Sequence, residues 1–274
     1  MTLFAREGGT PGQPSVLLLH GASVSSWMWT GTLQALPGLH TLAPDLPGLA
    51  ENARWGQFSL DGAADALAAL VEARCTGGQA HVVGHSLGGA VAARLLARHP
   101  QVVRSALLMG VTAEPIPFAR AFMAMTLAVS SATRSRRVLG WQASALGIPE
   151  EHRAQFIAQG LAQTRVELEH VLSEAMAFRV PPAFAEVQVP VLALAGDREG
   201  PINLRSACRL AGAVPGGQAY AVPGGGHAWM GRQPDLLLAT LSAWLAQGPL
   251  PKALRGLPLA PREPGGHRAL TARE

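Results

Sequence analysis

Short apolar runs alternate along the chain with stretches in which apolar residues recur at helical spacing. The runs are bounded by Pro, Gly or polar residues, and they are typical of strands that are buried on both faces. We predict strands at residues 16–19, 40–43, 81–84, 102–109, 191–195 and 218–222. Strands of this kind, alternating with helices, predict an α/β fold with a mostly parallel sheet covered by helices on both faces.

Helical patterns rich in Ala and Leu are present at residues 64–71, 90–98 and 236–245. Residues 112–185 interrupt the alternation of strands and helices, because they contain helical patterns but no good strand. The sequence therefore predicts a helical insertion between the fourth and fifth of these strands.

Length and composition agree with one large domain. The chain has 274 residues, of which 48% are hydrophobic and 15% charged, enough apolar material for a sizeable core. We assign residues 1–111 and 186–248 to the core domain and residues 112–185 to its insertion. Residues 249–274 are rich in Pro, Gly and Arg, and we expect them to form a flexible tail.

The sequence pI near 10.0 does not indicate a face that binds nucleic acid, because residues 252–274 carry +3 of the net charge of +4. The two cysteines, Cys75 and Cys208, make neither a disulfide framework nor a metal cluster. The N-terminal residues lack the features of a secretory signal, and the apolar segment 121–132 is too short to span a bilayer. We expect a cytoplasmic protein with no cofactor, no metal and no nucleic-acid or membrane partner.

The pattern Gly84-His85-Ser86-Leu87-Gly88 lies where a predicted strand becomes a predicted helix. Glycine at both flanking positions lets backbone pass close to backbone in a sharp turn, which raises the serine hydroxyl above the sheet edge. The helix that follows offers unpaired N–H groups and the positive end of its dipole to a developing oxyanion. The bare pattern is common, but its strand-to-helix setting indicates that Ser86 is a nucleophile.

A serine hydroxyl needs a general base, and His227 is the candidate. It follows a predicted strand and a glycine-rich turn and precedes the last predicted helix, so its imidazole can reach the strand ends. His85 is expected to point away from Ser86 across the turn. The main-chain N–H groups of Ala22, after a strand that ends at His20-Gly21, and of Leu87 are candidates for a two-donor oxyanion hole.

Five segments together resemble the α/β-hydrolase superfamily. They are "HGASVSSWMW" from residue 20, "DLPG" at 45–48, "VVGHSLGG" at 82–89, "VLALAGDREG" at 191–200 and "VPGGGHAW" at 222–229. They occur in the order typical of that family and span residues 14–247. The resemblance implies the α/β-hydrolase fold, with the insertion at 112–185 as a helical cap over the active site. A serine at position 86 argues against the relatives that use an aspartate nucleophile, namely haloalkane dehalogenases and epoxide hydrolases.

The chain departs from the family pattern in two informative places. Only one short strand, near residues 2–5, fits before the first apolar run, whereas the family usually opens with an antiparallel hairpin. The acid of the triad in similar hydrolases lies three residues after the glycine that ends the fifth strand, and this position is Glu199. Asp197 is the alternative, because aspartate is the commoner triad acid, and Glu114 is a more distant third. We favour Glu199 by position.

The candidate residues and the resemblance together predict a serine hydrolase. Its substrate would be a small or medium ester, thioester, lactone or related acyl compound, cleaved through an acyl-enzyme intermediate. Ser86 would attack the carbonyl, His227 would carry the proton, and Glu199 or Asp197 would orient His227. Carbon–carbon bond hydrolysis, perhydrolysis, acyl transfer and lyase chemistry by the same triad are alternatives. A ligand-binding receptor on a hydrolase scaffold is a further alternative.

The insertion gives only a weak indication of the substrate. Its large apolar side chains suit either an apolar pocket or the packing of the insertion onto the core. The residues concerned are Phe118, Phe122, Met123, Met125, Leu127 and Trp141.

Overall fold

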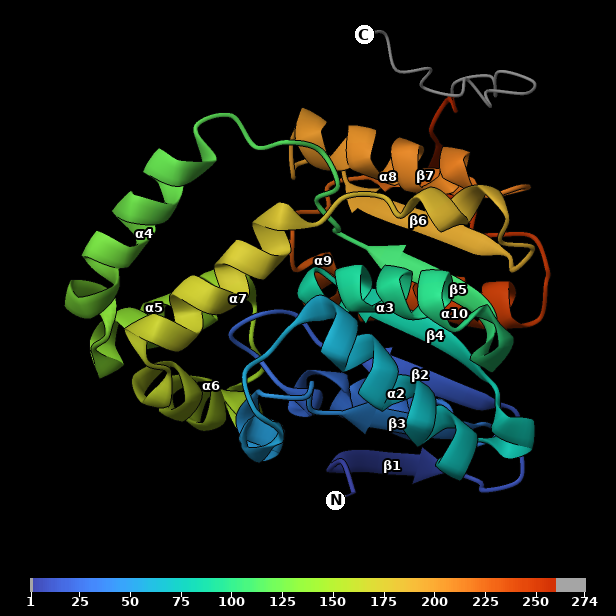
Figure 1. Cartoon of the computed structure of the whole chain (residues 1–274), viewed down its shortest axis with the longest axis horizontal. Coiled ribbons are helices and arrows are strands. Elements are labelled where there is room, and N and C mark those ends of the chain that lie inside the picture. Colours follow the sequence, from blue (N-terminus) through green and yellow to red (C-terminus); the bar gives the residue numbers. More distant parts are fainter. Residues whose placement is uncertain (1, 260–274) are drawn as a thin grey trace, which may run out of the picture.

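In a computed structural model of the chain, the structure describes residues 2–259, without the side chains of residues 122 and 129–133. One eight-stranded sheet runs through this part in the spatial order β1-β3-β2-β4-β5-β6-β7-β8 (Figure 1). The strands are β1 (Ala5–Gly9), β2 (Ser15–Leu19), β3 (His40–Pro44), β4 (Ala80–His85), β5 (Val103–Met109), β6 (Val191–Gly196), β7 (Gln218–Val222) and β8 (Arg255–Gly256). The outermost pairs, β1 with β3 and β7 with β8, are antiparallel, and the others are parallel. The predicted, mostly parallel sheet is confirmed.

The first strand differs from the expectation in its bounds. It covers Ala5–Gly9 rather than residues 2–5, and it pairs with β3 instead of forming a hairpin with β2. The connection between β1 and β2 is short, yet the two strands are not neighbours in the sheet.

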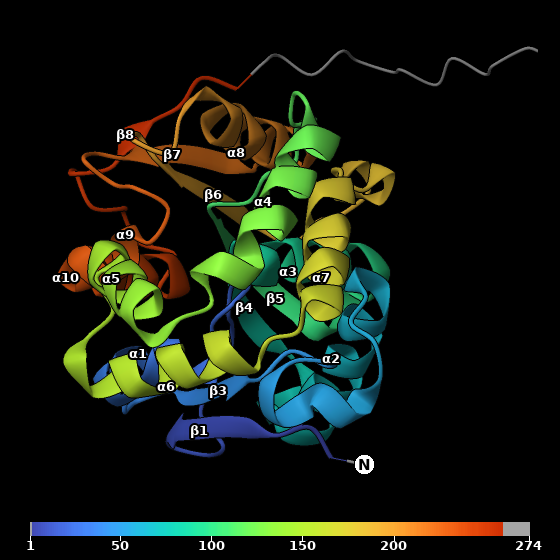
Figure 2. The ribbon, with the colours of Figure 1, turned by 90° about the vertical axis from the view of Figure 1, so that its left-hand side faces the viewer.

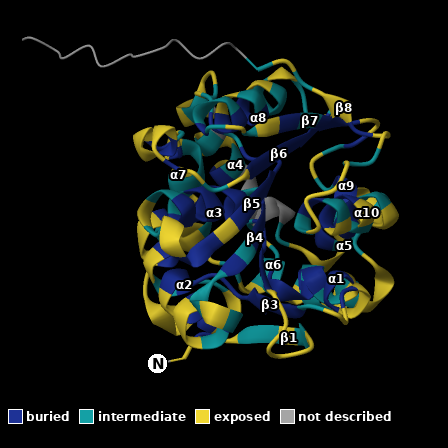
Figure 3. Cartoon of the chain, turned by 90° about the vertical axis from the view of Figure 1, so that its right-hand side faces the viewer, coloured by how far each residue is buried: buried dark blue, intermediate teal, exposed yellow. Residues whose placement is uncertain are grey.

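Helices cover both faces of the sheet. The α2, α3 and α8 helices lie on one face, and α1, α9 and α10 lie on the other (Figures 1 and 3). Their bounds are α1 (Thr30–Ala35), α2 (Leu60–Arg74), α3 (Leu87–Arg98), α8 (Pro201–Ala213), α9 (Trp229–Arg232) and α10 (Pro234–Leu245). Short 3-10 helices are η1 (Ser26–Trp29), η2 (Ala50–Trp55), η3 (Thr76–Gly78), η4 (Pro100–Val102) and η5 (Pro182–Ala185).

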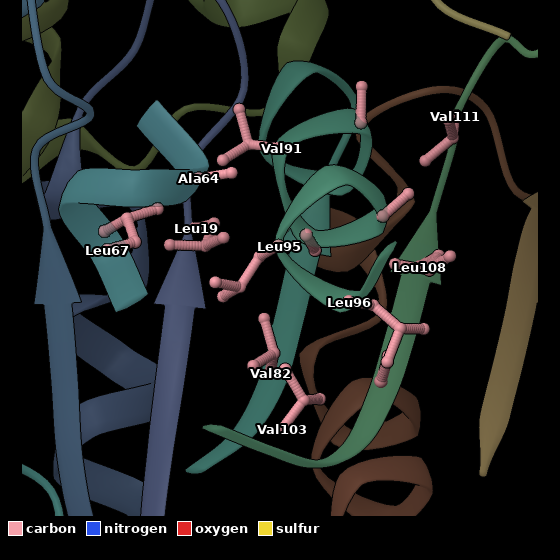
Figure 4. Packing of buried hydrophobic residues seen from close by; sticks show 14 of the residues in the cluster. Leu19, Ala64, Leu67, Val82, Val91, Leu95, Leu96, Val103, Leu108 and Val111 are labelled. Carbon is pink, nitrogen blue, oxygen red and sulfur yellow. The ribbon is translucent and has the colours of Figure 1, made fainter. Parts of the chain in front are cut away.

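The continuous apolar runs of the sequence are explained by two cores. Along β2, Leu17 and Leu19 point into the core beneath α2 and α3, whereas Val16 and Leu18 point into the core beneath α1 and α10. A strand with both faces buried has no solvent side on which polar residues would be stable. Figure 4 shows how Leu95 of α3 packs among side chains from the adjoining strands.

A group of four helices occupies the chain between β5 and β6. These are α4 (Ala119–Thr133), α5 (Arg136–Leu146), α6 (Glu150–Ala162) and α7 (Arg165–Ala177). Figure 2 shows them in front of the sheet, at the side toward which the parallel strands run in Figure 1. Several hydrogen bonds tie them to the core: for example, Trp27 Nε1 donates to Gln159 at 2.8 Å, and the Leu60 N–H donates to Glu174 at 2.8 Å.

The last described residues are ordered against the sheet. Strand β8 pairs with β7, the Leu257 N–H donates to the Ala219 carbonyl at 2.8 Å, and the side chain of Leu254 is buried. The flexible tail expected at 249–274 is therefore wrong for residues 254–257. Residues 260–274 lie outside the described part of the chain. The alternation of apolar and polar residues could not have predicted β8, because a strand of two residues is too short to show such a pattern.

Candidate active site

Ser86 occupies the sharp turn between β4 and α3. Its backbone has φ 55° and ψ −116°, a left-handed conformation that is strained for a residue with a side chain. The neighbouring glycines are required by close packing. A Cβ atom on Gly84 would lie 2.3 Å from the Gly88 carbonyl oxygen, and one on Gly88 would lie 2.4 Å from the Leu19 carbonyl oxygen. The structure therefore has the predicted sharp turn, and the close backbone contacts explain why glycine is needed on both sides of Ser86.

Three candidate side chains meet at this turn from three different loops. His227 Nε2 lies 2.9 Å from Ser86 Oγ, and His227 Nδ1 lies 2.8 Å from Glu199 Oε2. Glu199 follows β6, and His227 lies between β7 and α9, so all three stand at the carboxyl ends of parallel strands. The imidazole is 47% exposed, whereas the carboxylate is 1% exposed. A proton can therefore pass between Ser86 and His227 in a site that opens to solvent on the imidazole side.

The Glu199 carboxylate accepts several hydrogen bonds. One oxygen accepts from the Gly196 N–H at 2.7 Å, and the other accepts from Asn203 Nδ2 as well as from His227. Burial alone would raise the pKa of Glu199, but the hydrogen bond and charge of His227, together with the donors from Gly196 and Asn203, hold this pKa below its usual value. The side chain is consequently an anion, and its Oε2 accepts a hydrogen bond from His227 Nδ1.

The two rival acids lie elsewhere. Asp197 accepts the Gly224 N–H at 2.9 Å and so braces the turn before His227 without touching its ring. Glu114 pairs with Arg209 at 2.9 Å on the surface. The geometry thus brings Glu199, and neither Asp197 nor Glu114, to His227.

The two expected oxyanion donors flank Ser86. Leu87 is the first residue of α3, and the chain at Gly21-Ala22 passes close to the turn, since a Cβ atom on Gly21 would lie 3.4 Å from Ser86 Cβ. Within residues 2–259, the N–H groups of Ala22 and Leu87 donate to no protein acceptor. Unpaired N–H groups at a helix start are suited to an oxyanion.

Comparisons with known proteins identify the family of the chain. A family model described as "Alpha/beta hydrolase family" matches residues 16–240. The chain belongs to the alpha/beta hydrolase family. Among its relatives, an AB hydrolase superfamily protein of Gibberella zeae is 39% identical over 111 residues, covering 40% of this chain and 39% of that protein. The Mycobacterium tuberculosis protein named Lipase LipV is 35% identical over 107 residues, covering 39% of this chain and 41% of that protein.

The chain therefore spans about two fifths of the length of the curated relatives that it matches. Among solved structures, an alpha/beta hydrolase enzyme, MGS-M2, from a Medee basin deep-sea metagenome library, superimposes with a TM-score of 0.74 at 16% identity. That superposition covers 91% of this chain and 96% of that structure. At this low identity the similarity shows the fold alone.

In this member of the alpha/beta hydrolase family, His20 fixes the loop that carries Ala22. The Leu46 N–H donates to His20 Nε2 at 2.8 Å, so the ring proton must reside on Nδ1, which donates to the Gly21 carbonyl at 2.8 Å. The Gly21 carbonyl and the Ala22 N–H belong to one planar peptide group. The hydrogen bond from His20 to the Gly21 carbonyl therefore also fixes the direction of the Ala22 N–H, which points to the opposite side of the peptide group. Burial lowers the pKa of His20 and keeps its ring neutral.

The side chain of His85 contacts the loop and the ring of His227. Its Nε2 lies 2.8 Å from the main-chain carbonyl of His227, and the two ring centroids are 4.9 Å apart. A carbonyl only accepts, so the proton of His85 resides on Nε2. Burial and then the nearby His227 lower the pKa of His85 from 6.5 to about 3. The sequence interpretation gave neither His20 nor His85 a role, although both adjoin a glycine at the end of a strand.

The apolar residues of the insertion divide into three groups. Phe118, Met125 and Trp141 are exposed, Met123 is half-buried and Leu127 is buried. The side chain of Phe122 lies outside the described part. Met123 and Leu127 line a cavity of about 540 Å³ between α4 and α7, whereas for the three exposed residues a place in a pocket stays a prediction. No group of metal-binding side chains is present within residues 2–259, and none of their helices is long and apolar enough to cross a membrane.

A cavity of about 200 Å³ lies between the loop that carries Ala22 and the insertion. Ser23 and Val24 form one wall, and Leu49 and Val171 form others. The polar side chain of Gln159 at its edge already binds Trp27 and Ser25. The surface that remains for a guest is therefore mainly apolar.

Proposed function

We propose that the protein is a serine hydrolase that cleaves small carboxylic esters, or related thioesters and lactones, through an acyl-enzyme intermediate. The observation that carries this proposal is the continuous hydrogen-bonded chain from Ser86 through His227 to Glu199. A serine becomes a useful nucleophile when a base can take its proton, and a base is kept in the right tautomer by a buried carboxylate.

The first half of the reaction forms the acyl-enzyme. Ser86 Oγ attacks the ester carbonyl carbon while His227 Nε2 takes the hydroxyl proton. The carbonyl oxygen becomes an oxyanion that the Ala22 and Leu87 N–H groups stabilise. The carbon–oxygen bond to the alcohol then breaks, and His227 returns the proton to the departing alkoxide. Glu199 stabilises the imidazolium that exists between these two transfers.

The second half releases the acid. Water attacks the acyl carbonyl as His227 Nε2 takes one of its protons, and a second oxyanion forms at the same two donors. The bond from the acyl carbon to Ser86 Oγ breaks, and Oγ recovers its proton from His227. The exposed edge of His227 gives water a route to this position.

The cavity next to Ser23 supports a small acyl group. Its volume of about 200 Å³ holds about six or seven methylene-sized groups at roughly 30 Å³ each. Ser23 follows Ala22 directly, so an acyl chain entering this cavity would leave its carbonyl oxygen near the oxyanion donors. We expect acetyl to hexanoyl esters to be cleaved best.

Steady-state hydrolysis of p-nitrophenyl esters of increasing chain length tests the proposal. Ser86→Ala should lose turnover of every ester, by roughly 10³-fold or more, while Ser135→Ala, the same change at a helix cap in the insertion, should keep it. Ala53→Phe, which narrows the cavity, should move the preference to shorter esters. Undiminished turnover in Ser86→Ala would exclude the proposed nucleophile. A preference for long chains would exclude the proposed acyl pocket while leaving the nucleophile intact.

A further inference from the structure

A second cavity lies at the opposite edge of the sheet from Ser86. It has a volume of about 580 Å³ and is lined where β4, β5, β6 and β7 begin, at His81, Arg104, Pro190 and Gln218. The segment 247–254, which leads into β8, closes its other side. Figure 3 looks onto this edge of the molecule, away from the helices α4 to α7. A cavity of this size falls within the usual range for small-molecule sites.

The charges at this cavity are of one sign. The cationic side chains of Arg104 and Lys252 line it, next to the uncharged ring of His81, and no acidic side chain does. Within residues 2–259, neither Arg104 nor Lys252 forms an ion pair, whereas Arg74, Arg98 and other arginines of the core domain do. Burial and then the charge of Arg104 lower the pKa of His81, which shows that Arg104 stands close to this ring. Two cations that line one cavity without an acidic partner attract an anion.

The wall of the cavity also carries aromatic side chains. Trp244 is only 9% exposed, and its indole Nε1 has no hydrogen-bond partner among the described residues. Tyr220 and Leu250 line the same cavity. Apolar and aromatic walls favour a guest with an apolar body.

We propose that this cavity is a binding site for a small organic anion that joins one carboxylate or phosphate group to an apolar or aromatic body. Arg104 and Lys252 attract the anionic group, and Trp244 and Tyr220 contact the apolar body. The site is separate from Ser86, His227 and Glu199, and it does not depend on the proposed hydrolase activity. Lys252 is the only lysine of the chain and stands in the segment that β8 holds against the sheet.

Isothermal titration of the Ser86→Ala protein tests the site without ester chemistry. The probes are phenyl phosphate, benzoate, inorganic phosphate and benzyl alcohol. We expect phenyl phosphate or benzoate to bind with one saturable site per chain, with an affinity that falls as NaCl is added. Inorganic phosphate and benzyl alcohol should bind more weakly, because each lacks one half of the guest.

Variants locate the binding. Lys252→Gln and Arg104→Gln should each weaken binding of the best anion about three- to tenfold, as expected for partly exposed charges. Lys252→Arg, which keeps the charge, should restore it. Arg136→Gln removes an exposed, unpaired arginine of α5 and is the matched control. All three positions are exposed, so the four variants should fold.

The proposal is overturned by any of three results. The first is the absence of saturable binding of both organic anions. The second is binding that Lys252→Gln and Arg104→Gln leave unchanged, or that Arg136→Gln weakens equally. The third is an equal affinity for inorganic phosphate and phenyl phosphate, which would show that the aromatic side chains of the cavity do not contribute to binding.

Discussion

The side chain of His85 donates a hydrogen bond to the main-chain carbonyl of His227, 142 positions further along the chain. His85 directly precedes Ser86, so the turn that presents the proposed nucleophile also holds the loop that presents the proposed base, His227. The distance between Ser86 Oγ and His227 Nε2 is thereby set from both sides. A buried, neutral imidazole is suited to this position, because a cation below His227 would oppose the protonated state that catalysis requires.

Replacing His85 should therefore impair turnover more than substrate binding. His85→Leu removes the donor, and we expect kcat to fall about tenfold to a hundredfold, since small displacements of a catalytic group have effects of this size. KM should change little, because His85 contacts no substrate. His85→Gln keeps an N–H donor and should recover part of the loss. If KM rises and kcat is unchanged, His85 does not position His227.

The low pKa of His85 also makes a prediction about stability. The unfolded chain takes up a proton at His85 as the pH falls below about 6.5, whereas the folded protein takes it up only near pH 3. Acidification through this window therefore favours unfolding, by up to about 1.4 kcal/mol per pH unit. Urea unfolding of the His85→Gln protein between pH 6.5 and 4 should show a shallower loss of stability than the original protein. Equal slopes would contradict the buried, neutral state.

The acid of the triad can be separated from its rival by matched amides. Glu199→Gln should lower kcat by several orders of magnitude, on the order of 10⁴, because the amide favours the wrong tautomer of His227. Asp197→Asn should lower it far less, since Asp197 bonds only the Gly224 N–H. Measuring kcat for hydrolysis of a p-nitrophenyl ester by both variants decides which carboxylate is the acid of the triad. A larger loss in Asp197→Asn would reverse the assignment.

His20 offers a test of the oxyanion hole, whose donors are main-chain groups that side-chain substitution does not remove. His20→Ala frees the Gly21 carbonyl and with it the peptide plane of Ala22. We expect kcat to fall about tenfold or more, within the 10²- to 10³-fold cost of losing one donor outright. Ala22→Gly keeps the N–H group and should reduce kcat less than His20→Ala does. An unchanged kcat in a folded His20→Ala protein would show that this contact does not orient the donor.

The sequence was informative where local chemistry decides the structure. The apolar runs predicted six strands because most of the side chains of these strands are buried, and the glycines around Ser86 predicted its turn because no Cβ atom fits there. The position of Glu199 came from a family pattern, and the structure places its carboxylate 2.8 Å from His227.

What the sequence could not predict depends on contacts between distant segments. Strand β8 exists because β7 has a free edge, and a two-residue pairing leaves no periodic signal. The roles of His20 and His85 depend on Leu46 and on the His227 carbonyl, which only folding brings near. The amphipathic pattern of α8 was missed because several of its residues are polar and its first turn follows the loop that carries Glu199.

The central claim is that Ser86 is the group that becomes acylated. Treating the protein with a fluorophosphonate and mapping the adduct by peptide mass spectrometry measures this directly. We predict one adduct per chain, on the peptide that contains Ser86, and none in the Ser86→Ala protein. An adduct on another residue, or undiminished labelling of Ser86→Ala, would contradict the account.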